Sequence, residues 1–184
     1  MSELIHKKEW YHKLDLDGVV TPGIHDPRGT ESNMGFPESF TGKRVLDIGC
    51  ADGYYSFVAE RLGASKVVAI DEREWGSRTA KVLLNSSVEF KTMSVYDVSP
   101  ETVGYFDVVI FFGVLYHLKH PLLALEKIRS VCGKYALVES YVESVENSEY
   151  PVMRFFPNYE LNRDGSNWWG PNLSCLASML KTAG

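Results

Sequence analysis

The stretch Val45-Leu46-Asp47-Ile48-Gly49-Cys50-Ala51-Asp52-Gly53 decides the fold of this chain. An apolar run ends there in a turn of small residues, and a second apolar run ends further along at Asp71. Gly49 and Gly53 tolerate positive φ and let the backbone approach a ligand closely. The helix after the turn directs free N–H groups toward that ligand, and an acid at the end of the second strand is placed to hold ribose hydroxyls. We therefore expect a nucleotide-type cofactor site.

The residues of this turn indicate which cofactor it binds. A Gly-x-Gly-x-x-Gly turn fits a pyrophosphate, whereas this turn combines Gly49, Ala51 and Gly53 with the acids Asp47 and Asp52. Two carboxylates would repel a pyrophosphate, but they suit a cofactor tail that carries an ammonium and a sulfonium, as in S-adenosylmethionine. A structural strand-turn-helix in some other α/β domain is the alternative. With this acidic D-x-G-x-x-x-G turn, the chain resembles the class I methyltransferases.

Length and composition limit the domain organisation and the functions that the chain can have. The 184 residues, 45% of them hydrophobic, can bury one substantial core, so we expect one domain. A net charge of -5 argues against a broad electropositive face for nucleic acid, although a local patch would suffice for RNA. The cysteines lack C-x-x-C spacing, which predicts neither a zinc site nor disulfides, and no metal is expected. No apolar stretch has the length of a signal peptide or membrane span, so we expect a cytoplasmic location without membrane contact.

Alternating apolar and amphipathic segments predict the order of strands and helices. Apolar runs predict strands over 43–48, 66–70, 88–93, 106–112 and 134–140. Helical spacing predicts helices near 55–62 and 74–84, a third that opens at Pro121, and a last one that follows Asn172 as its N-cap. This series predicts a Rossmann-like, doubly wound, mostly parallel α/β sheet with ligands at the carboxyl ends of the strands. Residues 1–40 are interpreted as an N-terminal cap segment and 41–184 as the cofactor-binding domain.

The end of the sequence predicts an unusual sheet edge. Class I methyltransferases usually close their sheet with an antiparallel C-terminal hairpin, and the sequence stops at Gly184, where this hairpin is expected to begin. The fifth strand would then be an unpaired edge. Either the sequence is a shortened form, or another chain or the N-terminal segment covers this edge. We expect a protein that is a homo-oligomer, binds another chain at this edge, or is poorly soluble.

Further motifs extend the resemblance over most of the chain. They are Gly113-Val114-Leu115-Tyr116-His117 after the fourth strand, Gly18-Val19-Val20-Thr21-Pro22-Gly23 near the start, and Asn167-Trp168-Trp169-Gly170-Pro171-Asn172 near the end. Together they resemble the family of tRNA wobble-uridine (5-methoxy- and carboxymethoxy-uridine) methyltransferases and its shorter relatives. The resemblance runs from about Trp10 to Gly184.

This resemblance implies a role for residues along the cofactor. Tyr116 would lie at the reacting centre and Asp71 at the ribose. Val95 and Tyr96 would flank the adenine, with Phe112 on its opposite side. The full set of predicted cofactor-binding residues is Asp47, Gly49, Cys50, Ala51, Asp71, Glu72, Val95, Tyr96, Phe112 and Tyr116.

Departures from the family narrow the predicted function. The tRNA enzyme has a larger basic N-terminal region and a C-terminal arginine for a carboxylated cofactor, and this sequence has neither. We therefore favour plain methyl transfer from S-adenosylmethionine, with S-adenosylhomocysteine as product, to a small-molecule acceptor. A tRNA wobble-uridine methyl or carboxymethyl transferase is the alternative. A non-catalytic cofactor-binding remnant is a third interpretation.

Candidate catalytic and substrate residues follow the later strands. Tyr116 and His117 come directly after a buried strand, and one of them could orient or deprotonate an acceptor hydroxyl. Glu139 ends the fifth strand at the same edge of the sheet. The connection from 154 to 172 is too long for an ordinary loop and is interpreted as a lid in which Arg154, Asn167 and Trp168 contact substrate. The alternative for each is structural packing.

Overall fold

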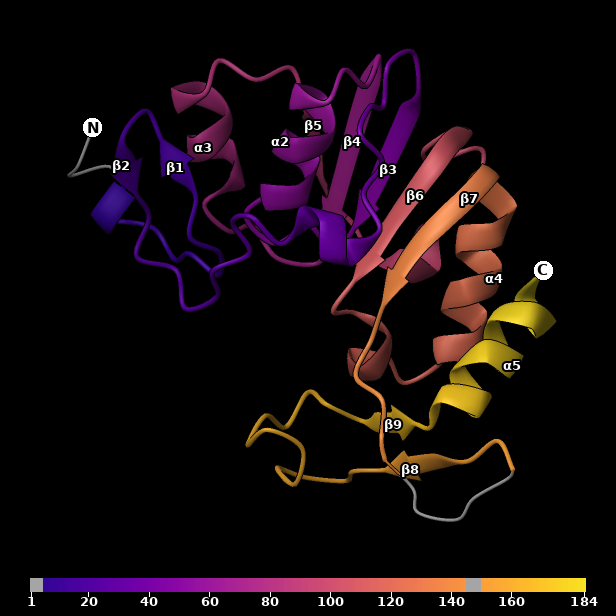
Figure 1. Ribbon diagram of the computed structural model, residues 1–184. Coiled ribbons are helices and arrows are strands. Elements are labelled where there is room, and N and C mark those ends of the chain that lie inside the picture. Colours follow the sequence, from indigo (N-terminus) through magenta and orange to yellow (C-terminus); the bar gives the residue numbers. More distant parts are fainter. Residues whose placement is uncertain (1–4, 145–149) are drawn as a thin grey trace.

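A parallel five-stranded sheet forms the centre of the molecule in the computed structural model, which describes residues 5–144 and 150–184 (Figure 1). Its strand order is β5-β4-β3-β6-β7, and all four pairings are parallel. The predicted α/β sheet is confirmed, because each predicted strand overlaps an observed one. Their bounds are β3 (Arg44–Ile48), β4 (Lys66–Asp71), β5 (Glu89–Thr92), β6 (Phe106–Phe112) and β7 (Cys132–Glu139).

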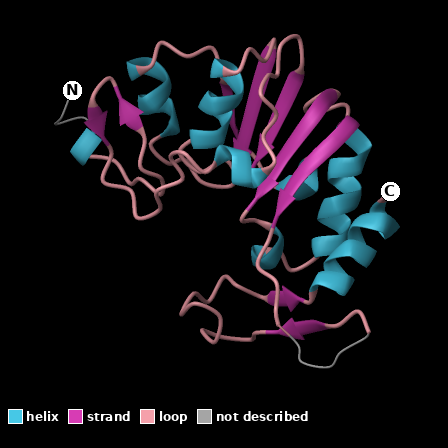
Figure 2. Cartoon of the chain, in the orientation of Figure 1, coloured by secondary structure: helices cyan, strands magenta, loops and turns pink. Residues whose placement is uncertain are grey.

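Helices cover both faces of this sheet (Figures 1 and 2). On one face lie α2 (Tyr54–Arg61) and α3 (Ser77–Leu83), and on the other lie α4 (Pro121–Val131) and α5 (Leu173–Ala183). Alternate strand residues serve the two sides: Val45 belongs to the hydrophobic cluster of α2, and Leu46 to the cluster of α4 and α5. Burial on both faces explains why these strands are continuous apolar runs rather than alternating ones.

Local signals at the helix ends are largely confirmed. Pro121 is the first residue of α4, and the Asn172 side chain caps α5 by accepting the Cys175 N–H at 2.8 Å. The helix predicted near 74–84 is shorter than expected, because α3 begins at Ser77 and ends at Leu83. Its buried residues are Ser77 and Ala80, whereas Val82 is 77% exposed.

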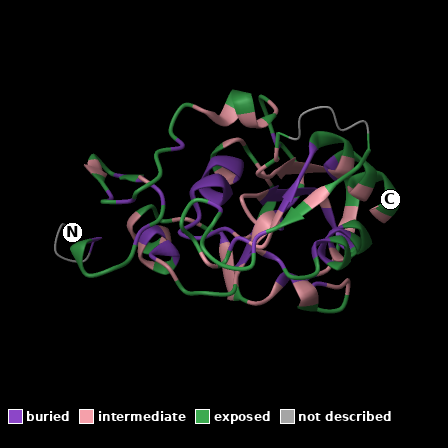
Figure 3. Cartoon of the chain, turned by 90° about the horizontal axis from the view of Figure 1, so that it is seen from below, coloured by how far each residue is buried: buried purple, intermediate pink, exposed green. Residues whose placement is uncertain are grey.

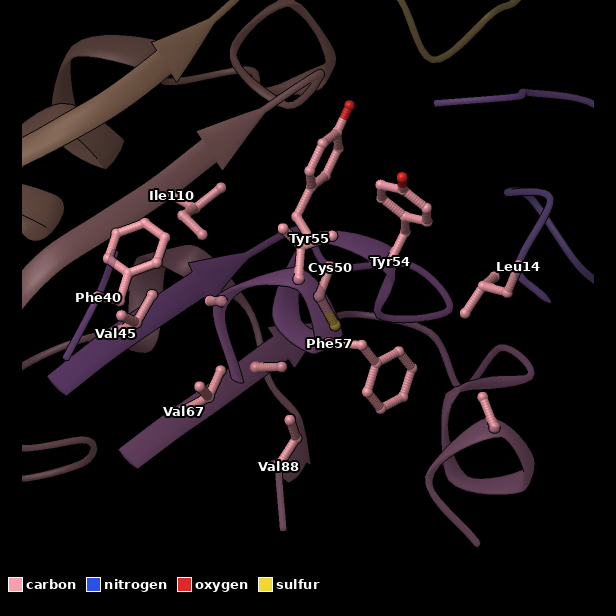
Figure 4. Packing of buried hydrophobic residues seen from close by; sticks show 14 of the residues in the cluster. Leu14, Phe40, Val45, Cys50, Tyr54, Tyr55, Phe57, Val67, Val88 and Ile110 are labelled. Atoms are coloured by element: carbon pink, nitrogen blue, oxygen red, sulfur yellow. The ribbon is translucent and has the colours of Figure 1, made fainter. Parts of the chain in front are cut away.

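The N-terminal residues fold back on themselves and pack against α2. Two short strands, β1 (Asp15–Leu16) and β2 (Val19–Val20), pair antiparallel. The Thr21 hydroxyl accepts the Leu14 N–H at 2.9 Å and donates to the His12 carbonyl at 2.7 Å, which closes the returning chain. Leu14 lies in one hydrophobic cluster with residues of α2 and the sheet (Figure 4). The division of the chain at residue 40 stays a prediction.

A second small sheet lies beyond the carboxyl ends of the large one. β8 (Met153–Phe155) pairs antiparallel with β9 (Trp169–Pro171), and α5 follows directly (Figure 1). Among residues 5–144 and 150–184 no strand pairs with the outer side of β7, so β7 is the edge strand there. A cavity of about 220 Å³ lies between β7, α4 and α5. Three short 3-10 helices, η1 (Glu31–Met34), η2 (Val95–Asp97) and η3 (Leu115–His117), complete the described elements.

Buried residues concentrate in the sheet and in α2 (Figure 3). None of the described helices is long and apolar enough to cross a membrane. Among the described residues, two buried side chains are acids, Asp47 of β3 and Asp52. Asp47 is only 2% exposed, and the Ser56 hydroxyl of α2 donates to it at 2.5 Å. Burial disfavours the charged carboxylate and raises the pKa of Asp47 to about 6.

Asp47→Asn tests the energetic consequence of that burial. Because the folded-state pKa lies above the unfolded one, the native state binds this proton more tightly, and the resulting stabilisation is lost as the pH rises from about 4 through about 6. The variant cannot ionise, so its free energy of unfolding relative to wild type should increase by about 3 kcal/mol between pH 4 and pH 7. Urea unfolding across this range measures it, with the exposed Asp17→Asn variant as control for the lost charge. If the difference in free energy of unfolding between variant and wild type did not change with pH, the raised pKa of Asp47 would be contradicted.

Gly23→Ala tests the folded-back N-terminal segment. A Cβ at Gly23 would lie 2.1 Å from the His12 carbonyl oxygen, so the backbone segments around His12 and Gly23 must move apart. We expect the free energy of unfolding to fall by about 3 kcal/mol and the amides of 12–25 to exchange faster with solvent. Gly18→Ala is the matched control: no atom lies within 4 Å of its Cβ, and its positive φ of 85° alone should cost about 1 kcal/mol. Equal effects of the two variants would refute the role given to Gly23.

Candidate active site

The turn after β3 is fixed to the ends of two neighbouring strands. Gly49 and Ala51 have left-handed φ values of 74° and 47°. The Gly49 and Cys50 N–H groups both donate to the Ile70 carbonyl, and the Ala51 N–H donates to the Asp71 carboxylate at 2.9 Å. A Cβ at Gly49 would lie 2.2 Å from a methyl group of Val114, which follows β6. The turn, the end of β4 and the loop after β6 therefore form one packed unit.

Asp71 retains capacity to bind a ligand. One of its oxygens accepts the Ala51 N–H, and the other accepts the Arg73 N–H at 2.9 Å and the Trp75 indole N–H at 3.2 Å. A carboxylate offers about four lone-pair positions, so roughly one is left for a ribose hydroxyl. The side chain is partly exposed. The adjacent Glu72 accepts the Ser94 hydroxyl at 2.8 Å and so joins this strand end to η2.

The three residues predicted at the adenine lie at the same end of the sheet but on its two faces. Val95 is buried, and Tyr96 packs beside it on the α4 side. The Tyr96 hydroxyl accepts the His120 N–H at 3.0 Å. Phe112 packs on the α2 side, edge-on to Tyr55 with ring centroids 5.0 Å apart. Their role toward adenine stays a prediction.

Asp47 and Asp52 both lie beneath the turn, out of solvent, as does the buried Cys50. The two Asp52 oxygens are occupied: one accepts the N–H groups of Tyr11 and His12 at 2.8 Å, and the other lies 2.5 Å from His12 Nδ1. The prediction that the Asp52 charge faces the cofactor is therefore wrong. This carboxylate binds the N-terminal segment to the turn, a contact across 40 residues that no local pattern signals.

A phenol and a carboxylate meet above Gly113, the residue that follows β6. A Cβ on Gly113 would lie 3.4 Å from the Tyr116 hydroxyl and 3.9 Å from Oε2 of Glu139. In the part of the chain that the structure describes, neither group has a hydrogen-bond partner within the protein. Burial and the negative charge of Glu139 raise the pKa of Tyr116. The structure thus brings together two of the predicted residues, with polar atoms free to bind a ligand.

Tyr11 adds a third polar group that sequence reasoning did not place among the site residues. Its ring stacks on His25 with centroids 5.7 Å apart and lies 6.2 Å from the ring of Trp75, the residue that donates to Asp71. Burial raises the pKa of Tyr11, and the charge of Glu139 raises it further. Tyr11 therefore lies beside Trp75 at the Asp71 end of the strand ends. The sequence placed Tyr11 only within the predicted N-terminal cap segment, which does not specify this contact.

Tyr55 lines the same region from α2. Figure 4 shows its ring projecting from the helix with the hydroxyl directed away from Val45 and Val67. The ring also lies edge-on to His12, with centroids 5.8 Å apart. Burial raises the pKa of Tyr55 to about 12, and the charge of Glu139 contributes. The charge of Glu139 at the end of β7 therefore acts on phenols from α2, η3 and the N-terminal segment.

The predicted lid residues differ in what they contact. The Trp168 N–H donates to the Tyr116 carbonyl at 2.8 Å, and its ring lies 4.9 Å from the Lys119 ammonium. Asn167 is 2% exposed; its amide donates to the Leu161 carbonyl, while its side-chain oxygen is buried without a partner. Arg154 instead lies 3.4 Å from Glu143 and over the ring of Phe156. Trp168 is thus joined to the Tyr116 loop, and the substrate roles of all three stay predictions.

His117 is the other predicted catalytic residue, and it lies beside Tyr116. Their ring centroids are 4.5 Å apart. Its Nδ1 lies 2.9 Å from the hydroxyl and 3.2 Å from the carbonyl oxygen of Ser166, in the loop that leads to Trp168. Burial lowers the pKa of His117, which favours the neutral imidazole.

Known sequences resemble this chain over most of its length. A family model described as a methyltransferase domain matches residues 32–178. A tRNA U34 carboxymethyltransferase of Desulforapulum autotrophicum is 29% identical over 152 residues, which cover 79% of this chain and 45% of that protein. The Pseudomonas aeruginosa protein of the same name is 31% identical over 156 residues, covering 78% and 45%. The chain spans about half the length of these curated relatives.

Solved structures share the fold. The N-terminal domain of EvdMO1, crystallised with SAH and D-fucose, has a TM-score of 0.72 at 19% identity and covers 100% of this chain and 84% of that one. The 1,6-didemethyltoxoflavin-N1-methyltransferase of Burkholderia thailandensis, bound to 1,6-didemethyltoxoflavin and S-adenosylhomocysteine, has a TM-score of 0.59 at 18% identity and covers 83% and 62%. With the family model matching well over half of its residues, the chain belongs to the methyltransferase domain family.

Proposed function

We propose that this chain transfers the methyl group of S-adenosylmethionine to a small-molecule acceptor bound beside Tyr116 and Glu139. The observation that carries the proposal is the convergence of polar groups above Gly113. The Tyr116 hydroxyl and the Glu139 carboxylate, which come from different elements, have no hydrogen-bond partner among the described residues. Partly buried polar atoms without partners are expected where a ligand completes the hydrogen bonding.

The cofactor would bind along the carboxyl ends of β3, β4 and β6. Asp71 supplies an acceptor for the ribose, and the backbone of Gly49 to Ala51 approaches the amino-acid tail without side-chain obstruction. The cofactor, when bound, brings a methyl group that a positively charged sulfur already activates. The chain therefore has to align the acceptor and exclude water. The Glu139 carboxylate also gives this end of the site a negative charge, which suits a sulfonium.

Charge favours a small acceptor over a nucleic acid. The net charge is -5, and both Glu139 and Asp164 act on the ionisation of Tyr116. A polyanion would be repelled by these acids, whereas a neutral or cationic molecule with hydrogen-bond donors would be attracted. One observation favours a second candidate: relatives such as those of D. autotrophicum and P. aeruginosa are named tRNA U34 carboxymethyltransferases. Methylation of a tRNA uridine is therefore the alternative to be tested.

Transfer of label separates these two acceptors. The protein is incubated with S-adenosylmethionine labelled in its methyl group, together with either bulk tRNA or the small-molecule fraction of a bacterial extract. We expect label to enter the small-molecule fraction, with a rate that changes little with salt. Label in tRNA, with a rate that falls steeply as salt increases, would establish the alternative. Label in neither fraction, despite cofactor binding, would count against both acceptors.

Asp71→Ala tests where the ribose binds. Losing hydrogen bonds to a charged acceptor should weaken binding of S-adenosylhomocysteine by about 10- to 100-fold, as measured by calorimetry. Asp17→Ala, at an exposed acid in the N-terminal segment, is the matched control. Because Asp71 also accepts protein N–H groups, thermal unfolding must show that the variant is folded at the assay temperature. Unchanged affinity in a folded variant would refute the ribose assignment.

A further inference from the structure

His117 is held by a chain of hydrogen bonds that ends on an acid. Its Nδ1 lies 2.9 Å from Ser166 Oγ and 3.2 Å from the Ser166 carbonyl oxygen. Ser166 Oγ in turn donates to Asp164 at 2.7 Å, and the Ser166 N–H donates to the same carboxylate oxygen at 2.8 Å. These hydrogen bonds lower the pKa of Asp164 and keep it ionised. The loop 164–166 and η3 thus meet at one imidazole.

The direction of these hydrogen bonds fixes where the imidazole proton resides. A carbonyl oxygen can only accept, so Nδ1 must donate to it. The single proton of the Ser166 hydroxyl points to the Asp164 carboxylate, which leaves Oγ only its lone pairs to offer to His117. Both contacts therefore require a proton on Nδ1. In the neutral ring, Nε2 then carries a lone pair, and it has no hydrogen-bond partner among the described residues.

The order of Asp164, Ser166 and His117 excludes nucleophilic catalysis by the serine. In a serine nucleophile site, the imidazole takes the serine proton and the acid orients the imidazole. Here the serine lies between the acid and the imidazole, and its proton points to the acid. Ser166 is therefore not activated for attack. The arrangement orients His117 instead.

We propose that Ser166 and Asp164 are positioning residues that hold His117 as the Nδ1–H tautomer, so that Nε2 takes the proton released by the methyl acceptor. This inference rests on the proposed function, and it deepens it, because the acceptor must then carry an O–H or N–H group. As the acceptor atom bonds to the methyl carbon, the bond from that carbon to sulfur breaks and its electron pair stays on sulfur. The acceptor proton passes to Nε2, and the imidazolium later releases it to water.

The surroundings of His117 support a neutral base near neutral pH. Burial lowers its pKa, whereas the Ser166 carbonyl and the negative charge of Asp164 act in the opposite direction. From η3 the ring of Tyr116 packs against it, and Lys119 lies over the neighbouring ring of Trp168. The short helix η3, which carries His117, lies next to β9. The segment that contains Ser166 and Trp168 therefore packs against the helix that carries the imidazole.

Nitrogen-15 NMR of the histidine rings tests the tautomer directly, in the intact protein saturated with S-adenosylhomocysteine. At pH 8 we expect His117 to show a pyrrole-type Nδ1 and a pyridine-type Nε2. His120, whose ring nitrogens make no hydrogen bond in the described structure, is the internal reference and should show a mixture of both tautomers. A proton on His117 Nε2 would overturn the proposal. Failure of the protein to bind the nucleoside at all would instead overturn the proposed function.

Variants of the loop separate positioning from folding. Ser166→Ala removes one of the two Nδ1 acceptors and should give a mixed tautomer, and Ser166→Thr, which keeps the hydroxyl, should restore Nδ1–H. Label transfer into the small-molecule fraction should fall about 10-fold in Ser166→Ala and about 100-fold or more in His117→Ala, with nucleoside affinity unchanged. The exposed Ser178→Ala on α5 is the matched control. Full transfer activity in a folded His117→Ala variant would overturn the proton-acceptor role.

Discussion

The buried carboxylate of Asp52 is the interaction on which the rest of this site depends. A carboxylate removed from water is strongly destabilising unless donors surround it. Here three donors come from two consecutive residues, Tyr11 and His12, and the side chain is fully buried. The same acid belongs to the turn after β3, so the N-terminal segment is attached directly to the cofactor turn. This attachment, together with the hydrogen bond from the His25 N–H to the Tyr11 carbonyl, holds Tyr11 beside Trp75 and His25.

The parallel sheet then determines which residues lie next to the turn after β3. β3, β4, β6 and β7 all end at one edge, so the turn at Gly49, the acid Asp71, the Gly113 turn and Glu139 lie along one line of strand ends. The N-terminal segment contacts the turn at Asp52, and further along it approaches β7, where a Cβ on Gly35 would lie 3.6 Å from Leu137. The β8–β9 segment joins the Tyr116 loop through Trp168. The N-terminal segment and the β8–β9 segment, which border the site, thus come from opposite ends of the chain. Neither could form the site alone.

The sequence was sufficient for the sheet because its strands are buried on both faces and therefore read as continuous apolar runs. Pro121 and Asn172 located two helix starts for similarly local reasons. Prediction failed where a residue's role depends on a distant partner. From the sequence alone Asp52 is interpreted as an acid that faces the cofactor, but in the fold its carboxylate contacts His12. Likewise, nothing near Ser166 in the sequence indicates its contact with His117. The β8–β9 pairing is short and joins segments separated by a long connection, so it leaves no periodic pattern.

The contact between Gly49 and Val114 has a consequence for how this site can evolve. The backbone of the cofactor turn and the side chain that begins the Tyr116 loop are in van der Waals contact, with no space for a single added carbon. The loop after β6, where we propose that the acceptor binds, therefore packs directly on the turn after β3, where we propose that the cofactor binds. A shift in one must displace the other, so ligand affinities at the two subsites are thermodynamically linked and each ligand strengthens or weakens the other by the same factor. Under the proposed function, acceptor preference changes more readily through the β8–β9 segment, which contacts the Tyr116 loop, than through the loop after β6.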